Sequence, residues 1–249
     1  MRRTLGCFLV SCLALPLTAA AQPAATVGRG FFSVYMGAQS GDGASTQGGT
    51  FSIYEEQGTF GAKQSYDGAG LLSIGGGVRV MGHLAVGAAF SRMSDDQAGT
   101  VTVSAPHPLV FATLRTAALA QSGLKHEETA FHLQALYVVP VGEKFELVVG
   151  GGPSFISVKH DFVSGAGFAE TSAPYSNINI TNVKVTRADK TATGFNVGAE
   201  ATFFLTRNIG VGGFARWAGA KAHLDTGAGR TEAVDLGGPQ IGAGVRGRF

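Results

Sequence analysis

Eight segments of this chain alternate large apolar residues with small or polar ones, and one face of every segment carries no charge. A repeat of two residues is the signature of β-strands, in which successive side chains point to opposite faces. The sequence therefore predicts an all-β chain with eight strands. The segments lie at 32–38, 72–80, 84–90, 131–141, 145–155, 195–205, 209–217 and 241–249.

The two faces of these segments differ in a way that a soluble β-sandwich would not show. A sandwich places charges on the solvent side and packs large aliphatic residues inside. Here all the strand charges lie among small and polar residues, on a face with too little apolar bulk to form a core. We therefore expect the large side chains to face lipid and the polar face to line a lumen. That polar face includes Ser73, Arg79, Gln134, Glu146, Asn196, Glu200, Thr202 and Arg216.

The links between the segments alternate in length. Three are tight turns at 81–83, 142–144 and 206–208, and four are long, at about 39–68, 94–128, 160–192 and 221–235. This sorting predicts an antiparallel up-and-down transmembrane β-barrel, with short periplasmic turns and long extracellular loops. A soluble lipocalin-like barrel has no reason to sort its loops by length. Residues 101–103 and 177–180 also alternate, so we expect some hairpins to continue beyond the membrane.

Aromatic residues fall at two heights along the predicted strands. Phe145 and Phe155 are ten residues apart, roughly 33 Å along a strand at about 3.3 Å per residue. A tilt of about 40° reduces this distance to a height of roughly 25 Å, the expected apolar band between two aromatic girdles. The girdle on the loop side comprises Phe90, Phe131, Phe155, Phe195 and Trp217.

The amino-terminal region predicts export. Arg2 and Arg3 precede the apolar run 5–17, and Ala19-Ala20-Ala21 fits a cleavage site, so residues 1–21 are predicted to be a cleaved signal peptide. The run is too short for a transmembrane anchor. A lipoprotein cleavage box at 9–12 and a twin-arginine signal remain as alternatives. A short lead at 22–30 and a barrel domain at 31–249 would follow.

Removal of the signal peptide changes the composition of the chain. Both cysteines, Cys7 and Cys12, lie within residues 1–21, so the mature chain would have no disulfide and no thiolate site. Without Arg2 and Arg3, seventeen basic side chains balance seventeen acidic ones. This balance gives no reason to expect a nucleic-acid partner.

The last strand, Ile241-Gly-Ala-Gly-Val-Arg-Gly-Arg-Phe249, resembles the carboxyl-terminal strand of small eight-stranded bacterial outer-membrane β-barrels (OmpA-, OmpX- and Ail-like). The resemblance extends over about 30–249, although Gly247 stands where the family usually has an aromatic residue. It implies the outer membrane of a Gram-negative bacterium, with Phe249 in the insertion signal that the barrel assembly machinery reads. It also implies a monomer in contact with outer-membrane lipid and lipopolysaccharide, and a possible surface ligand or host partner at the loops.

The inward charges predict an ion-pair network in the lumen, because buried charges need partners. An eight-stranded barrel is just wide enough for side chains to fill. Glu200 and Arg216 should lie diagonally opposite on neighbouring strands, with the others nearer the periplasmic end. A narrow conduction path, with an arginine excess that favours anions, is the alternative. The predicted network comprises Arg79, Glu146, Glu200, Arg216, Arg246 and Arg248.

No convergent catalytic constellation is recognisable, and no cofactor or metal site is expected. His160 with Asp161 and Ser157, and the inward-pointing His132, are the nearest approach to a catalytic cluster. The histidines show no metal-ligand spacing. Three roles therefore compete: a non-enzymatic structural or surface-interaction protein, which the sequence favours, a narrow porin-like channel for small solutes, and a lipid A-modifying barrel enzyme.

Overall fold

A computed structural model describes residues 29–40, 43–66, 68–227 and 230–249. The predicted signal peptide, 1–21, and all but the end of the predicted lead lie outside the described residues. In the described part of the chain, no helix is long and apolar enough to cross a membrane. The structure contains ten strands: β1 (Gly30–Gln39), β2 (Gly43–Ile53), β3 (Glu56–Tyr66), β4 (Ala69–Met81), β5 (Leu84–Pro106), β6 (Leu114–Val141), β7 (Phe145–Glu170), β8 (Ile178–Phe204), β9 (Ile209–Gly227) and β10 (Arg230–Arg248).

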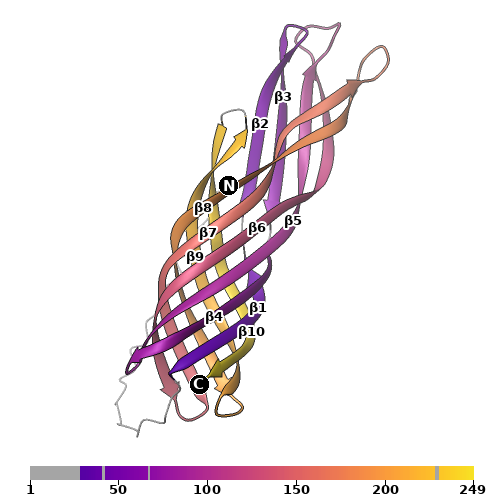
Figure 1. Ribbon diagram of the computed structural model, residues 1–249. Helices are drawn as coiled ribbons and strands as arrows, with labels where there is room; N and C mark the ends of the chain where they lie inside the picture. The colour runs from indigo at the N-terminus through magenta and orange to yellow at the C-terminus, as the bar shows by residue number, and fades with distance from the viewer. Residues whose placement is uncertain (1–28, 41–42, 67, 228–229) are drawn as a thin grey trace, which may run out of the picture.

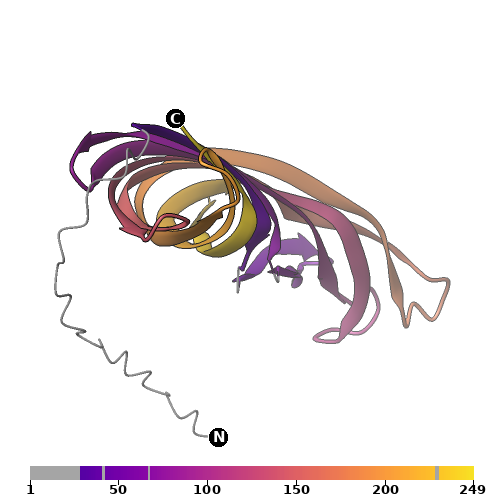
Figure 2. The same ribbon diagram turned by 90° about the horizontal axis from the view of Figure 1, so that it is seen from below.

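Eight of the strands form a closed antiparallel ring, in the order β5-β4-β1-β10-β9-β8-β7-β6 and back to β5. Figure 2 shows this ring from below, along its length. The last strand closes the ring on the first, with Phe32 opposite Gly247 and Ala38 opposite Ile241. The predicted eight-stranded fold and its closure are therefore confirmed, and neither edge of the ring is left open.

The three tight turns lie at one end of the ring, near the carboxyl terminus (Figure 1). The outward-facing positions of the ring carry no charge, and their large apolar side chains are exposed. Phe145 is 38% exposed, Phe155 41% and Phe195 58%. The predicted faces of the strands are thus confirmed. A surface of this kind is stable only against an apolar solvent.

Gly247 stands where an aromatic residue was expected, and the structure gives a physical reason. A β-carbon at Gly247 would collide with the ring of Phe32, which lies opposite on β1. Phe32 is 51% exposed on the outward face of the ring. The neighbouring strand therefore supplies the aromatic side chain that the last strand lacks.

The four long links consist largely of strand and build an extension that we call the tower (Figure 1). The β2–β3 hairpin continues the wall, because β3 pairs with the upper part of β5, from Thr59–Ser104 to Ser65–Ala98. β6 and β7 pair only up to His126 and His160. Above that level, the β7–β8 ribbon packs its apolar side against the sheet formed by β2, β3, β5 and β6. Buried residues of this contact include Ala62, Val101, Val103, Leu124, Val163 and Ile178.

The inner face of the wall changes character between the ring and the tower. In the lower part of β6, even-numbered residues such as Leu124 point inward. In the upper part, odd-numbered residues such as Arg115 and Ala117 point inward instead. The pairing with β5 shifts between Gln97 and Gly99 to accommodate one extra residue in β6. Gly123, at φ 75°, lies in this bulge, where an L side chain would be strained.

The expectation that the lumen holds too little apolar bulk for packing is wrong. Leu136, Val138 and Val148 form a buried cluster on the inner wall near the turns. Tyr35 packs against Phe214 higher up, with ring centroids 5.2 Å apart. A narrow ring can hold apolar side chains between its charges, so the lumen is a packed interior of mixed polarity.

Candidate functional site

An ion-pair network fills the lower lumen around Arg246, which is 1% exposed. Its guanidinium lies 3.2 Å from a carboxylate oxygen of Glu146 and 2.5 Å from one of Glu200. Arg79 approaches Glu146 from the other side at 3.6 Å. The face of the Phe31 ring lies 3.9 Å from the Arg246 guanidinium carbon. One arginine thus connects carboxylates from two different strands across the lumen.

Two residues of the predicted network lie elsewhere. Arg216 donates to the side chain of Gln240 at 2.7 Å and to the Ser73 hydroxyl at 3.4 Å. Arg248 donates to the carbonyl of Arg207 in a turn at the rim, and its guanidinium stacks on Phe204 at 3.7 Å. Among the described residues, neither arginine lies within 4.0 Å of a carboxylate oxygen, and polar groups nearer to each take its donors.

The middle of the lumen is also closely filled. His132 lies between the hydroxyls of Ser154 at 2.8 Å and Ser91 at 3.1 Å, and it is completely buried. Below it, Tyr35, Glu200 and Arg216 line a cavity of about 20 Å³. Such a volume holds about one water molecule. The described residues therefore leave no wide path through the ring.

A second polar network closes the mouth of the ring, at the base of the tower. Glu128 of β6 reaches across the lumen and accepts a bond of 2.8 Å from Gln39 of β1 and one of 3.1 Å from the Gly237 N–H of β10. On its own wall, His126 lies 3.1 Å from the same carboxylate. One buried carboxylate therefore holds opposite walls together. We call this group, with His160 and Gln64, the mouth network.

The hydrogen-bond partners in the mouth network determine which histidine nitrogen donates and which accepts. The Gln64 carbonyl oxygen can only accept, so His160 donates to it from Nε2 at 3.3 Å. The Nδ1 atom of neutral His160 then accepts from Nδ1–H of His126 at 2.8 Å. Burial, followed by the adjacent His126, lowers the pKa of His160 from 6.5 to about 4. His160 is thus held neutral between an acceptor and a donor.

Apolar side chains cover the mouth network from the tower side. Leu224 of β9 and Val234 and Leu236 of β10 are buried against Val158 and Phe162 of β7. Contacts of this kind exclude water from the polar network below. The end of the ring that would have to open for conduction is therefore closed by both polar and apolar contacts.

The residues considered for catalysis do not converge. His160 points into the mouth, whereas Asp161 accepts from Arg187 at 2.7 Å and from the Lys125 N–H at 3.1 Å. Ser157 bonds Thr191 at 2.7 Å and is exposed. The three side chains therefore have different hydrogen-bond partners.

The mouth network was not predicted, because residues 94–128 were expected to form a loop. His126 and Glu128 continue the inward alternation of His132 and Gln134. A strand extended by five residues, from 131 back to 126, would have placed both side chains in the lumen.

The apex of the tower is held by a buried arginine. Arg115 donates to a carboxylate oxygen of Glu170 at 2.5 Å and to the Tyr175 carbonyl at 3.1 Å. The Tyr54 hydroxyl donates to Glu170 at 3.0 Å. The hydrogen bond from Arg115 lowers the pKa of Glu170. These contacts tie the tips of three hairpins together.

The segment 109–111 projects from this tied apex. Leu109 is 72% exposed, Val110 51% and Phe111 81%. Three consecutive exposed apolar side chains at an ordered tip are typical of interaction surfaces.

Among the described residues, no three histidine, cysteine, aspartate or glutamate side chains are placed to hold a metal ion. The closed ring, its apolar outer band and its two girdles define an integral membrane β-barrel protein.

The sequence profile of the outer membrane protein beta-barrel domain matches residues 10–249, and the chain belongs to this family. The protein is therefore located in the outer membrane. No curated protein matches the sequence.

Among solved structures, the outer membrane protein OprG from Pseudomonas aeruginosa is similar at a TM-score of 0.51 and 11% identity, over 90% of this chain and 96% of that one. Neisserial surface protein A has a TM-score of 0.46 and 12% identity, and the match covers 88% of this chain and 96% of that one. Ail of Yersinia pestis, in complex with the heparin analogue sucrose octasulfate, has a TM-score of 0.37 and 12% identity. The match covers 88% of this chain and 99% of that one. Only the first of these likenesses supports the shared fold.

Proposed function

We propose that this protein is a non-enzymatic surface-interaction protein, whose closed ring anchors a rigid tower that presents its apex to partners outside the cell. The observation that carries the proposal is the exposed apolar tip 109–111 on an apex fixed by Arg115 and Glu170. Fixing the tip in advance reduces the entropy lost on binding. The expected partner is a protein with an apolar pocket. Phe249 remains the expected insertion signal for barrel assembly.

The closed lumen supports this role over that of a channel. A solute would have to displace Arg246 from two carboxylates, separate Glu128 from the opposite wall and open the apolar cover. Each of these steps exposes buried charge or apolar surface, which costs free energy. We therefore expect no stepwise conductance from the purified protein in planar lipid bilayers.

Cells that display the protein provide the test of surface interaction. We expect them to bind immobilised extracellular-matrix proteins, and expect Leu109→Ser with Phe111→Ser to abolish binding because both side chains are exposed at the tip. Lys63→Gln, an exposed change on the side of the tower, is the control that should bind normally. Unchanged binding by the tip variant, or clear conductance steps in bilayers, would contradict the proposal.

A further inference from the structure

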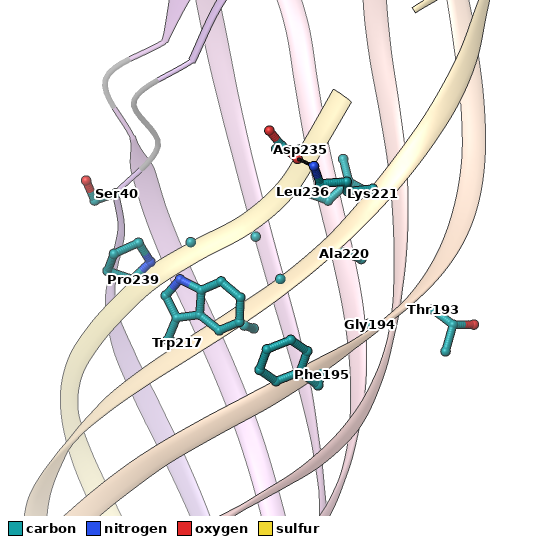
Figure 3. Close-up of a pocket in the computed structure, with 14 residues that line it drawn as sticks. Ser40, Thr193, Gly194, Phe195, Trp217, Ala220, Lys221, Asp235, Leu236 and Pro239 are labelled. Carbon is teal, nitrogen blue, oxygen red and sulfur yellow. Dashed lines mark ion pairs between the residues drawn. The ribbon is translucent and has the colours of Figure 1, made fainter. Parts of the chain in front are cut away.

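The outer side of the ring carries a groove of about 660 Å³ where β8, β9 and β10 meet the tower (Figure 3). Its floor has a simple origin in the sequence. Gly219 of β9 and Gly237 of β10 are direct neighbours in the sheet. Neither has a side chain, and the Trp217 indole lies over Gly219. Grooves of this size accommodate small molecules or parts of larger ones.

The height of the groove determines what surrounds it. Phe195 and Trp217 form its lower wall, with ring centroids 4.9 Å apart. Both belong to the girdle on the tower side, 58% and 41% exposed. Aromatic girdles mark the boundary between lipid chains and head groups. The groove thus opens beside the head groups of the outer leaflet.

The lining of the groove is apolar below and polar above. Trp217 and Pro239 form the base, whereas Lys221 and Asp235 form an ion pair of 3.7 Å at the upper rim (Figure 3). Their side chains are 80% and 83% exposed, so each charge can take a new partner at little cost. The Ser40 and Thr193 hydroxyls lie at the two sides of the groove (Figure 3).

We propose that this groove binds the sugar–phosphate head group of an outer-leaflet glycolipid, that is, of lipopolysaccharide. The apolar face of a sugar ring would pack against Trp217. Asp235 would accept hydrogen bonds from sugar hydroxyls, and Lys221 would pair with a phosphate. Continuity with the lipid-facing band favours a membrane lipid as occupant. An aromatic wall together with both charges favours a sugar phosphate over a simple phospholipid head. The site lies away from the apex of the tower and does not depend on the function proposed for that apex.

Trp217 is the single tryptophan of the chain, so its fluorescence reports directly on the groove. The test is a titration of the folded protein, in zwitterionic detergent micelles, with purified lipid A. A parallel titration uses phosphatidylglycerol, which carries a phosphate and acyl chains but no sugar ring. We expect a saturable change in Trp217 emission with lipid A, at a concentration at least tenfold below that for phosphatidylglycerol.

Three variants separate a built site from general charge attraction. Lys221→Gln and Asp235→Asn should each weaken lipid A binding about tenfold, the loss expected for one hydrogen bond to a charged group. Lys159→Gln removes an exposed lysine on β7 outside the groove and should bind lipid A as the parent does. Because all three leave Trp217 in place, the fluorescence readout is preserved. Heat-modifiable gel migration verifies that each variant is folded.

Equal responses to lipid A and phosphatidylglycerol, no saturation, or equal losses in the Lys159 and Lys221 variants would each overturn the proposal. The binding test for the tower uses different residues and a different readout. Failure of one proposal is therefore distinguishable from failure of the other.

Discussion

Replacement of Arg246 by methionine should destabilise the ring by about 3 kcal/mol or more, because removing one member of a buried ion pair costs about 3–5 kcal/mol. The structure places the effect at the lower end of this range. Glu146, only 4% exposed, keeps Arg79 at 3.6 Å, and the Glu200 side chain, 27% exposed, can reach water. Methionine retains most of the apolar stem that packs beside Phe31.

The measurement is urea unfolding in lipid vesicles, followed by gel migration and by Trp217 fluorescence. Arg248→Met is the matched control on the same strand and the same face. Arg248 stacks on Phe204 and donates to one carbonyl at the rim, so its loss should cost about 1 kcal/mol or less.

A third variant tests the cause of the destabilisation. Adding Glu200→Gln to Arg246→Met removes the carboxylate that is left unpaired, whereas Glu146 still has Arg79, so this double variant should recover part of the lost stability. If Arg246→Met and Arg248→Met cost the same, or if the double variant is no more stable than Arg246→Met, the network does not stabilise the ring.

Three further outcomes follow from other contacts. Because the folded-state pKa of His160 is depressed from 6.5 to about 4, the mouth is fully stable above pH 6.5 and loses up to about 3 kcal/mol as the pH falls through 4. Amide exchange of the β9–β10 ribbon, corrected for its intrinsic pH dependence, should rise over that interval, and no change would refute this. Gly247→Phe should impair folding, measured as heat-modifiable gel migration, because the new ring collides with Phe32, and adding Phe32→Ala should restore folding. If the Gly247→Phe variant folds at the normal yield, Phe32 does not occupy the place of the expected aromatic residue. Glu170→Gln should speed proteolysis within 171–177 about tenfold, by removing a charged hydrogen-bond partner at the apex, and an unchanged rate would show that this ion pair does not hold the tip.

The membrane part of the fold was predictable because lipid imposes a strict rule on every second residue. Segments such as 145–155 and 195–205 obey this rule without exception, and the structure pairs them as expected. The closing pair of strands followed from the need to leave no free edge. Alternation, the sorting of link lengths and the need to close the sheet thus sufficed to predict the ring and its order.

The tower and the network details depended on three-dimensional contacts that alternation does not specify. The β2–β3 segments are rich in glycine, serine and threonine on both faces, so no clear period marks them as strands. Which carboxylate Arg246 contacts, and that Arg216 finds Gln240, depends on the shear of the ring. A sequence gives the face on which such a side chain lies, but not its partner across a lumen.

The bulge at Gly123 has a consequence for how such a protein can change in length. Inward and outward positions alternate strictly, so a one-residue insertion in a tower strand would exchange its two faces. Hairpins above the mouth can therefore grow or shrink by two residues per strand, or by one where a bulge absorbs the difference. The extra residue of β6 lies just above the mouth network, beyond Leu124. An engineer could graft a tower of another height at this position and leave the membrane-embedded ring in its original register.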